Sequence, residues 1–294
     1  MFKRILLPLD GSEQSEKALA YGEELAVRLG SELVLYHVHR HDQQEQEHLY
    51  SVYLESIAAR LRGKLRKTGA KVTTQVEAGD PQHSICDLVG KNEIDLIIMA
   101  ASSSSGMKVG KALGSVTDHV CRTVPIPVML IRPESVRPTG SKGRLLKRLL
   151  IPLDGSELSR LALSVGEGLA AELKLSITIF QMASMIRLYN DGSEAAAYGI
   201  YERFNETEKR RVSTEMQETA KGLRAKGIKA TSKVTSGFDA AYEIIELSKK
   251  AGVDLVVMST HGRTGLGRWV FGNVAEKVLR HGQTPLLLVH SAAG

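Results

Sequence analysis

The sequence predicts an α/β protein made of two doubly wound domains, each with a five-stranded parallel sheet and helices on both faces. Two observations predict this fold class: an internal repeat that spans most of the chain, and the alternation of short apolar runs with helical patterns inside each copy. The length agrees, since 294 residues are roughly twice a common domain of about 150. A hydrophobic content of 43% gives each half enough apolar residues for a core.

The repeat gives the number of domains. Arg4–Glu13 and Arg148–Glu157 are identical at eight of ten positions, at an offset of 144 residues. Later matching pairs, such as 94–99 with 253–258 and 127–131 with 285–289, lie at offsets of 159 and 158. The second copy therefore carries an insertion, which we place within 183–204. The Pro-, Gly- and Ser-rich stretch 132–143 is typical of a linker, so we expect domain 1 at 1–134 and domain 2 at 146–294.

Each copy alternates strands and helices in the same order. In domain 1 the apolar run 5–9 is typical of a strand buried on both faces. Gly11 and Ser12 then turn the chain, and Ser12 or Ser15 caps a helix that runs to about Leu29, with Gly30 at its end. We expect the remaining strands at 32–39, 72–76, 94–99 and 128–131, and helices at 50–67, from 79–81 to about 91, and over 114–122. This alternation implies right-handed crossovers and a parallel sheet.

Composition and charge exclude several classes of protein. No apolar run approaches 18 residues, which excludes a membrane span, and the first residues lead straight into a strand without a signal-peptide pattern. We therefore expect a cytoplasmic protein with Cys86 and Cys121 as free thiols in hydrophobic helical stretches. The net charge of +6 arises in residues 141–294, which hold 22 basic and 16 acidic residues. Aromatic residues are scarce and no basic stripe is present, so binding to nucleic acid is not expected.

A glycine-rich loop after the fourth strand of domain 2 is the candidate binding site. In a doubly wound sheet, ligands bind beyond the carboxyl ends of the strands where the strand order reverses. Here Gly262, Gly265 and Gly267 would let the backbone approach a ligand, and Gly272 and Asn273 begin a helix whose free N–H groups favour an anion. The alternative is a loop that only connects a strand to a helix. Walker A, dinucleotide-fingerprint and nucleophile-elbow motifs are absent.

Taken together, these motifs resemble those of the universal stress proteins, in two copies that cover essentially the whole chain. Each copy has Pro-Leu-Asp-Gly-Ser-Glu after its first strand, Asp-Leu-(Ile/Val)-(Ile/Val)-Met on its fourth, and a Gly-(Ser/Asn)-Val helix start. The stretch Thr260-His-Gly-Arg-Thr-Gly265 is also typical of this family. The resemblance implies a strand order of 3-2-1-4-5 in each domain, binding of ATP or a related adenine nucleotide in many members, and dimers formed through the last strand.

The resemblance also implies site residues, on the family's pattern Gly-x2-Gly-x9-Gly-(Ser/Thr). In domain 2 this pattern has Ser259 for the first Gly and Asn273 for the final hydroxyl residue, and both replacements are small and polar. Domain 1 has lost its two leading glycines to Ala101 and Ser104, so we expect a weaker site there. The residues implied for domain 2 are Asp154, Met182, Ser259, His261, Gly262, Gly272 and Asn273, and those for domain 1 are Asp10, Val38, Ser104, Gly114 and Ser115.

Three functions remain open at this stage. The first, which we favour, is a stress-response module that binds ATP or another adenine nucleotide, with or without Mg²⁺, and changes how an unidentified protein partner recognises it. The second is a slow ATPase, for which the sequence supplies no clear general base and no catalytic residue. The third is an interaction protein that binds no ligand. Asp10 and Asp154 also fit an alternative role as turn residues after a strand.

Two further expectations concern metals and assembly. His39, His41 and His48 lie near Asp42 without a recognised metal-ligand spacing, so we expect a solvated strand exit and no protein metal site. The final strands 128–131 and 286–289 are apolar and lie at a sheet edge, which favours pairing. We expect the two domains to pair through them within one chain, and a homodimer is left open. For Tyr189, Tyr198, Tyr201 and Phe204 in the insertion, packing over the site and packing at an interface are equally open.

Overall fold

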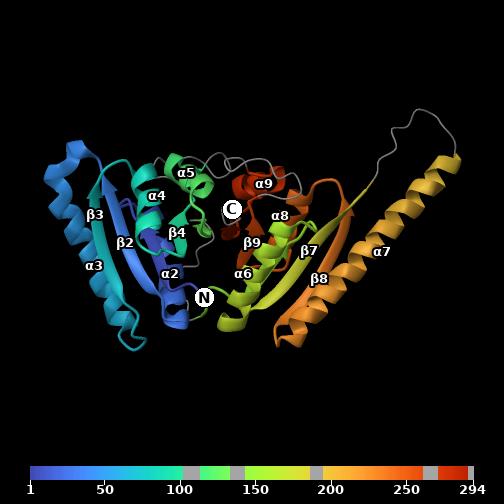
Figure 1. Ribbon diagram of the computed structural model, residues 1–294, viewed down its shortest axis with the longest axis horizontal. Helices are drawn as coiled ribbons and strands as arrows, with labels where there is room; N and C mark the ends of the chain where they lie inside the picture. The colour runs from blue at the N-terminus through green and yellow to red at the C-terminus, as the bar shows by residue number, and fades with distance from the viewer. Residues whose placement is uncertain (102–112, 133–142, 186–194, 261–270, 291–294) are drawn as a thin grey trace.

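A computed structural model describes residues 1–101, 113–132, 143–185, 195–260 and 271–290. In these residues the two predicted domains share one 10-stranded sheet with helices on both faces (Figure 1). The strand order is β3-β2-β1-β4-β5-β10-β9-β6-β7-β8. The doubly wound α/β class predicted from the sequence is confirmed. Among the described residues, no helix combines the length and apolar character that crossing a membrane requires.

The bounds of the elements follow the repeat. Domain 1 contains β1 (Arg4–Pro8), α1 (Glu13–Glu16), α2 (Ala18–Leu29), β2 (Glu32–His39), a short 3-10 helix η1 (His41–Gln46), α3 (Glu47–Leu65), β3 (Val72–Ala78), α4 (Pro81–Lys91), β4 (Leu96–Ala100), α5 (Ser115–Thr123) and β5 (Val128–Ile131). Domain 2 contains β6 (Arg148–Pro152), α6 (Glu157–Leu173), β7 (Ser176–Ser184), α7 (Ala195–Ala225), β8 (Lys229–Gly237), α8 (Ala240–Lys250), β9 (Leu255–Ser259), α9 (Asn273–His281) and β10 (Leu286–Val289).

The last strands of the two domains join the two halves of the sheet. Pairing within each domain is parallel, whereas β5 and β10 pair antiparallel, with Leu286 opposite Leu130 and Leu288 opposite Val128. This is the intramolecular pairing that the apolar final strands predict. It covers both exposed strand edges at the centre of the molecule, where unpaired backbone groups would otherwise invite association.

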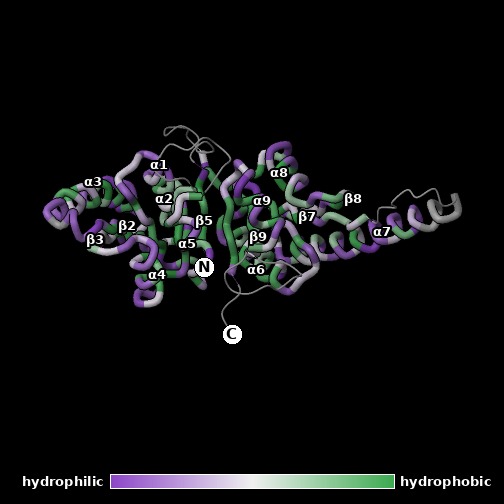
Figure 2. Tube along the Cα trace, turned by 90° about the horizontal axis from the view of Figure 1, so that it is seen from above, coloured by the Kyte–Doolittle hydropathy of each residue, from purple (hydrophilic) through white to green (hydrophobic). Residues whose placement is uncertain are grey.

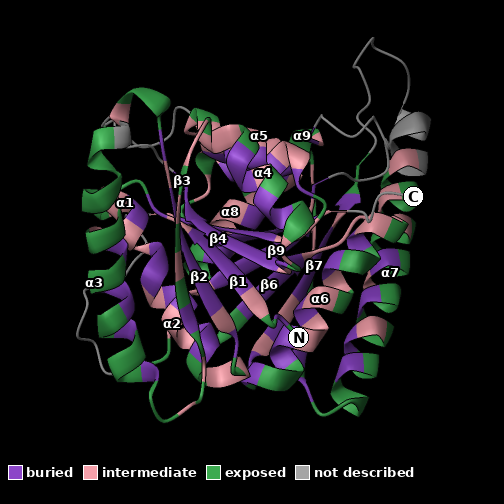
Figure 3. Ribbon diagram, turned by 60° about the vertical axis from the view of Figure 1, so that its left-hand side comes forward, coloured by how far each residue is buried: buried purple, intermediate pink, exposed green. Residues whose placement is uncertain are grey.

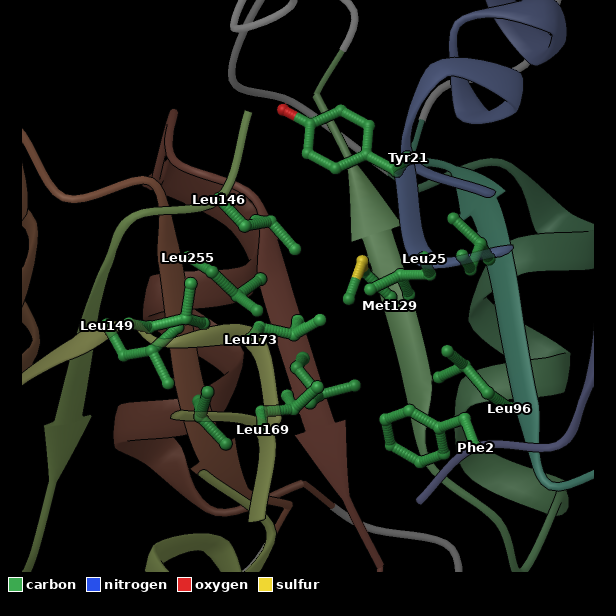
Figure 4. Packing of buried hydrophobic residues seen from close by; sticks show 14 of the residues in the cluster. Phe2, Tyr21, Leu25, Leu96, Met129, Leu146, Leu149, Leu169, Leu173 and Leu255 are labelled. Carbon is green, nitrogen blue, oxygen red and sulfur yellow. The ribbon is translucent and has the colours of Figure 1, made fainter. Parts of the chain in front are cut away.

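Two hydrophobic clusters lie on opposite faces of the sheet, because successive strand residues point to opposite sides. Ile5 and Leu7 of β1 belong to the cluster under α2, α3, α6 and α7, while Leu6 belongs to the cluster under α4, α5, α8 and α9. Figure 3 shows the strands buried along the centre of the molecule between exposed outer helix faces. Around the domain junction, Leu25 and Met129 of domain 1 and Leu169 and Leu173 of domain 2 belong to one buried cluster (Figure 4).

An ion pair on α2 connects domain 1 to domain 2. The Glu24 carboxylate accepts hydrogen bonds from the backbone N–H groups of Leu145 (2.5 Å) and Leu146 (3.2 Å) and from Nη1 of Arg28 (2.6 Å). Arg28 in turn donates to the carbonyl oxygens of Leu146 (3.2 Å) and of Leu173, the last residue of α6. The pair therefore fixes both the entry to β6 and the end of α6 relative to domain 1.

Several local expectations need correction. The first predicted helix is divided at Lys17 into α1 and α2, and the second begins at Glu47 rather than at residue 50 because η1 leads into it. The 31 residues of α7 exceed the 19 of α3, so part of the insertion extends this helix (Figure 1). In Figure 2 the tube of α7 alternates between hydrophobic and hydrophilic residues. Phe204 is 51% exposed and belongs to neither hydrophobic cluster of the described residues, whereas most of the linker and Tyr189 lie outside them.

Candidate functional site

A cavity of about 330 Å³ lies in domain 2 beyond the carboxyl ends of β6 and β9. This is the point where the strand order reverses, since β6 lies between β7 and β9. Five of the predicted site residues line it: Asp154, Met182, Ser259, Gly272 and Asn273. Residues that are far apart in the sequence are thus brought to one opening at the edge of the sheet.

The turn after β6 holds Asp154 at the cavity. Gly155 has φ +83, a left-handed conformation that glycine adopts without strain. Oδ1 of Asp154 accepts hydrogen bonds from the backbone N–H (2.9 Å) and the hydroxyl (2.6 Å) of Ser156. Oγ of Ser156 then accepts from the N–H of Ser159 and caps α6. Asp154 therefore has the turn role that the sequence left open, and it also lines the cavity.

The first turn of α9 forms another side of the cavity, with Gly272, Asn273, Val274 and Ala275 among the lining residues. Helices α4, α6 and α8 each begin with a side chain that accepts from the first-turn N–H groups. By contrast, the N-cap residue of α9 is Gly272, which precedes Asn273 and provides no side-chain cap. The free N–H groups and the positive end of the helix dipole make such a terminus favourable for an anion.

The opposite wall of the cavity is apolar. Phe180 and Met182 come from the same face of β7, and Ile244 of α8 and Met258 of β9 complete the surface. Phe180, Ile244 and Met258 were missed in the sequence. The period of two in a strand could have found Phe180, because it lies two residues before the predicted Met182 and so points to the same side. The cavity thus combines an apolar wall, a carboxylate and a helix N-terminus.

Domain 1 has a smaller counterpart, of about 150 Å³, at the carboxyl ends of β1 and β4. Four predicted residues line it: Asp10, Val38, Gly114 and Ser115. As in domain 2, its last helix, α5, begins at a glycine, Gly114, without a side-chain cap. Tyr36 occupies the place of Phe180, and its hydroxyl donates to Oε2 of Glu77 at 2.6 Å.

The turn after β1 matches its counterpart in domain 2. Gly11 has φ +82, and the N–H and hydroxyl of Ser12 donate to Oδ1 of Asp10 at 2.9 and 2.5 Å. Burial opposes ionisation of this carboxyl, but the hydrogen bonds from Ser12 and Ser15 outweigh it and hold the pKa of Asp10 below its ordinary value. Asp10 is therefore a carboxylate at neutral pH. Ser104, His261 and Gly262 lie outside the described residues.

Of the three histidines predicted at a solvated strand exit, His41 and His48 are exposed as expected, whereas His39, the last residue of β2, is buried. His39 is 1% exposed, and His37 is 4% exposed and contacts the carbonyl oxygen of Leu9 through Nδ1 at 2.7 Å. Both rings stack on Tyr50 of α3, with centroids 4.0 Å apart for His37 and 5.8 Å for His39. Within the described part of the chain, no group of three or more potential metal ligands is present. The histidines pack α3 against the sheet on the face opposite to the cavity.

Comparison with known proteins agrees with this architecture. The sequence model of the universal stress protein family matches twice, over residues 1–132 and 146–290. Universal stress protein MJ0531 of Methanocaldococcus jannaschii is 30% identical over 149 residues, which are 49% of this chain and 82% of that protein. Universal stress protein Slr1230 of Synechocystis sp. is 24% identical over 97% of this chain and 99% of its own. The crystal structure of a universal stress protein from Archaeoglobus fulgidus has the same fold, with a TM-score of 0.69 at 20% identity over 98% of both chains.

Proposed function

Because this chain belongs to the universal stress protein family, we propose that it is a stress-response protein that binds ATP or a related adenine nucleotide in domain 2. In this proposal the bound nucleotide changes a surface that a protein partner reads, and turnover is not required. The observation that carries the proposal is the uncapped N-terminus of α9 at a cavity with an apolar wall and one side formed by Asp154.

Each part of a nucleotide has a matching part of the cavity. The apolar surface of Phe180, Met182 and Met258 suits a planar adenine ring. Asp154 can accept hydrogen bonds from ribose hydroxyls, because a carboxylate has acceptor sites on both oxygens. The N–H groups at the start of α9 and the amide of Asn273 would donate to the phosphates. The glycine loop that follows Ser259 would complete the phosphate site, as the family pattern implies.

The two cavities support domain 2 as the principal site. Small-molecule pockets commonly enclose about 300 to 1,000 Å³, and the domain 2 cavity, at about 330 Å³, falls in that range. The domain 1 cavity, at about 150 Å³, falls below it, and it adjoins a wider surface hollow of about 660 Å³ at Pro81, Ser115 and Val116. We therefore propose that domain 1, at 1–134, binds the nucleotide weakly or not at all, and that domain 2, at 146–294, binds it well.

The described lining favours binding over hydrolysis. Among the lining residues that the structure describes, Asp154 supplies the carboxylate, and Ser156 already occupies its Oδ1. A Mg²⁺ ion that arrives with the triphosphate would find one carboxylate rather than a cluster of ligands. The side chains therefore fit a nucleotide that brings its own metal ion, and we propose that any ATP hydrolysis is slow.

The variant Asn273→Asp tests the proposal at the helix terminus. The substitution keeps the shape of the side chain but sets a negative charge where the phosphates would bind, and we expect ATP affinity to fall at least tenfold. Folding should not suffer, because an acidic residue in the first turn of a helix is favourable. The matched control is Ser115→Asp at the start of α5, which should change the affinity little if domain 2 is the principal site.

Calorimetric titration of ATP, together with an assay of nucleotide released on denaturation, gives the measurement. No released nucleotide and no binding heat at millimolar ATP would contradict the proposal and favour the ligand-free interaction protein. Phosphate release measured in the same samples separates a binder from an ATPase.

A further inference from the structure

A cation of domain 1 lies against the residue that precedes the helix terminus of domain 2. The guanidinium carbon of Arg122, on α5, is 4.5 Å from the centroid of the Phe271 ring. Phe271 immediately precedes Gly272, at which α9 begins. A guanidinium at this distance from a ring is attracted to the negative face of the aromatic quadrupole. The contact connects two parts of the chain that are about 150 residues apart and belong to different repeats.

Arg122 is held rigidly on its own side. Its Nε and Nη2 donate to the two carboxylate oxygens of Asp118, one turn earlier on α5, at 2.9 and 3.1 Å. The hydrogen bond to Asp118 raises the pKa of Arg122 above its ordinary value, and the charge of Glu276 in the first turn of α9 adds to the effect. A bidentate pair of this kind fixes the plane of the guanidinium as well as its position.

A second contact fixes the position of α5 relative to domain 2. Nε2 of His290, just beyond β10, donates to the carbonyl oxygen of Cys121 at 2.7 Å. Cys121 is fully buried and directly precedes Arg122. Because β10 also pairs with β5, the end of α5 is attached to domain 2 both beside Arg122 and through the shared sheet.

Phe271 is equally well fixed on the domain 2 side. The ring is 4% exposed and belongs to the hydrophobic cluster under α8 and α9. The next residue, Gly272, donates its N–H to the carbonyl oxygen of Thr260 at 2.9 Å, and Thr260 donates to Val289 of β10 at 3.1 Å. The buried ring and the backbone hydrogen bond thus hold two successive residues at the start of α9.

We propose that Arg122 of domain 1 is a positioning residue for the anion-binding terminus of domain 2. Its stacking on Phe271 aligns Gly272 and the first turn of α9, so that the site in domain 2 depends on the presence of domain 1. The identity of the ligand as an adenine nucleotide rests on the proposed function, whereas the positioning of Gly272 and the first turn of α9 does not. A tandem chain of this kind thus uses its first repeat as part of the support of the second site.

The single tryptophan of the chain, Trp269, makes the test specific, since it lies two residues before Phe271. Its fluorescence anisotropy and its quenching by acrylamide report on this segment without ATP, and its change on titration of ATP reports on domain 2 alone. The variants are Arg122→Met, Arg122→Lys, Phe271→Leu and the double variant Arg122→Met/Phe271→Leu. The matched control is Arg211→Met on α7, which removes an arginine that pairs with Glu208 and Glu215 on one exposed helix face.

We expect Arg122→Met to lower the anisotropy of Trp269, to increase its quenching and to weaken ATP binding by about three- to tenfold, in line with the strength of a cation–π contact. Phe271→Leu should have a similar effect. The double variant should be no worse than the stronger single one, because both remove the same contact. Arg122→Lys should restore only part of the wild-type signal, since an ammonium group still attracts the ring but cannot form the bidentate pair with Asp118. Arg211→Met should leave both the fluorescence and the affinity unchanged.

The inference is overturned if Arg122→Met leaves the Trp269 signal of the ligand-free protein unchanged, or if the two single variants have additive effects. If Arg122→Met fails to fold, Asp118→Asn loosens the same guanidinium with a smaller perturbation, and an unchanged Trp269 signal in that variant has the same meaning. If wild-type protein binds no ATP, the proposed function fails. The Trp269 measurements on ligand-free protein then still decide the positioning role of Arg122.

Discussion

The glycine at position 166 offers a sharp test of how α6 packs on the sheet beside the candidate site. Gly166 lies in the middle of α6 and faces Ile151 of β6, three residues before Asp154. A Cβ at position 166 would overlap Cδ1 of Ile151 and lie 3.4 Å from Cγ1. The equivalent glycine of domain 1, Gly22, faces Leu7, and a Cβ there would lie 2.8 and 3.3 Å from the two terminal methyl groups of the leucine.

For Gly166→Ala, two opposite effects determine the change in the free energy of unfolding. Alanine gains about 1 kcal/mol over glycine in a helix interior. Overpacking a well-filled core costs about 1 to 3 kcal/mol. Ile151 is fully buried among packed side chains, so its Cδ1 has little free space into which it could rotate, and we expect a net loss of about 1 kcal/mol or more. Gly22→Ala should cost less, because its Cβ would overlap the terminal methyl groups of Leu7 less deeply.

A double-mutant cycle isolates the contact. Ile151→Val removes Cδ1 and by itself costs about 0.5 to 1.5 kcal/mol. The double variant Gly166→Ala/Ile151→Val should then be at least as stable as Ile151→Val alone, because the overlap is gone and the gain in helix propensity remains. Urea unfolding followed by Trp269 fluorescence and far-UV circular dichroism measures the four stabilities. The reasoning is refuted if Gly166→Ala is at least as stable as wild type, or if the two changes simply add.

Three further predictions follow from described contacts. Glu24→Gln should lower the free energy of unfolding by about 1.5 to 3 kcal/mol, because a charged acceptor of two backbone N–H groups is lost. The control Glu23→Gln loses only a surface pair with Lys64 and should cost under about 1 kcal/mol. Equal effects of the two variants in urea unfolding would contradict this prediction. Burial lowers the pKa of His37 below its ordinary 6.5, so the unfolded chain takes up the proton first and the free energy of unfolding falls as the pH drops through 6.5 toward the folded-state pKa. His37→Gln should reduce the slope of the free energy of unfolding against pH between pH 7 and 5. An unchanged slope would exclude His37 as its source. Lys174, at the end of α6, has a left-handed φ of +52 at the position where domain 1 has Gly30. Lys174→Gly should therefore raise the free energy of unfolding by about 1 kcal/mol. Thermal unfolding measures the change, and a lower melting temperature would contradict the prediction.

Local chemistry made much of the fold predictable from the sequence. The Asp-Gly-Ser sequence predicts a turn after each first strand, and Gly11 and Gly155 adopt the positive φ that such a turn needs. The apolar final strands predict the pairing of β5 with β10, because an apolar edge that stays in water is costly. Met182 and Val38, which the family resemblance implies as site residues, line the two cavities.

What could not be predicted depends on contacts between distant segments. His39 ends a strand and is followed by polar residues, which is typical of a solvated exit, yet it is buried and its ring stacks on Tyr50 of α3. The contact of Arg122 with Phe271 requires the relative position of the two domains, which no local pattern contains. Tyr36 and Phe180 line the two cavities at equivalent positions, and the hydrogen bond of the Tyr36 hydroxyl to Glu77 joins residues 41 positions apart.

The pairing of the two domains gives a physical reason for their divergence. In a symmetric dimer of identical subunits, every substitution is present in both subunits. A substitution that improves support for the partner's site must therefore also leave the subunit's own site intact. Fusion into one chain removes that constraint, so the first repeat can lose its glycine loop while α5 keeps the Asp118–Arg122 pair that lies against domain 2. Such a division of roles accounts for a first repeat with a small cavity and intact contacts to its neighbour. It also implies that substitutions at Gly114 or Ser115 would change binding little, whereas loss of the cation at Arg122 would weaken it about three- to tenfold, although Arg122 is in the same domain and outside both cavities.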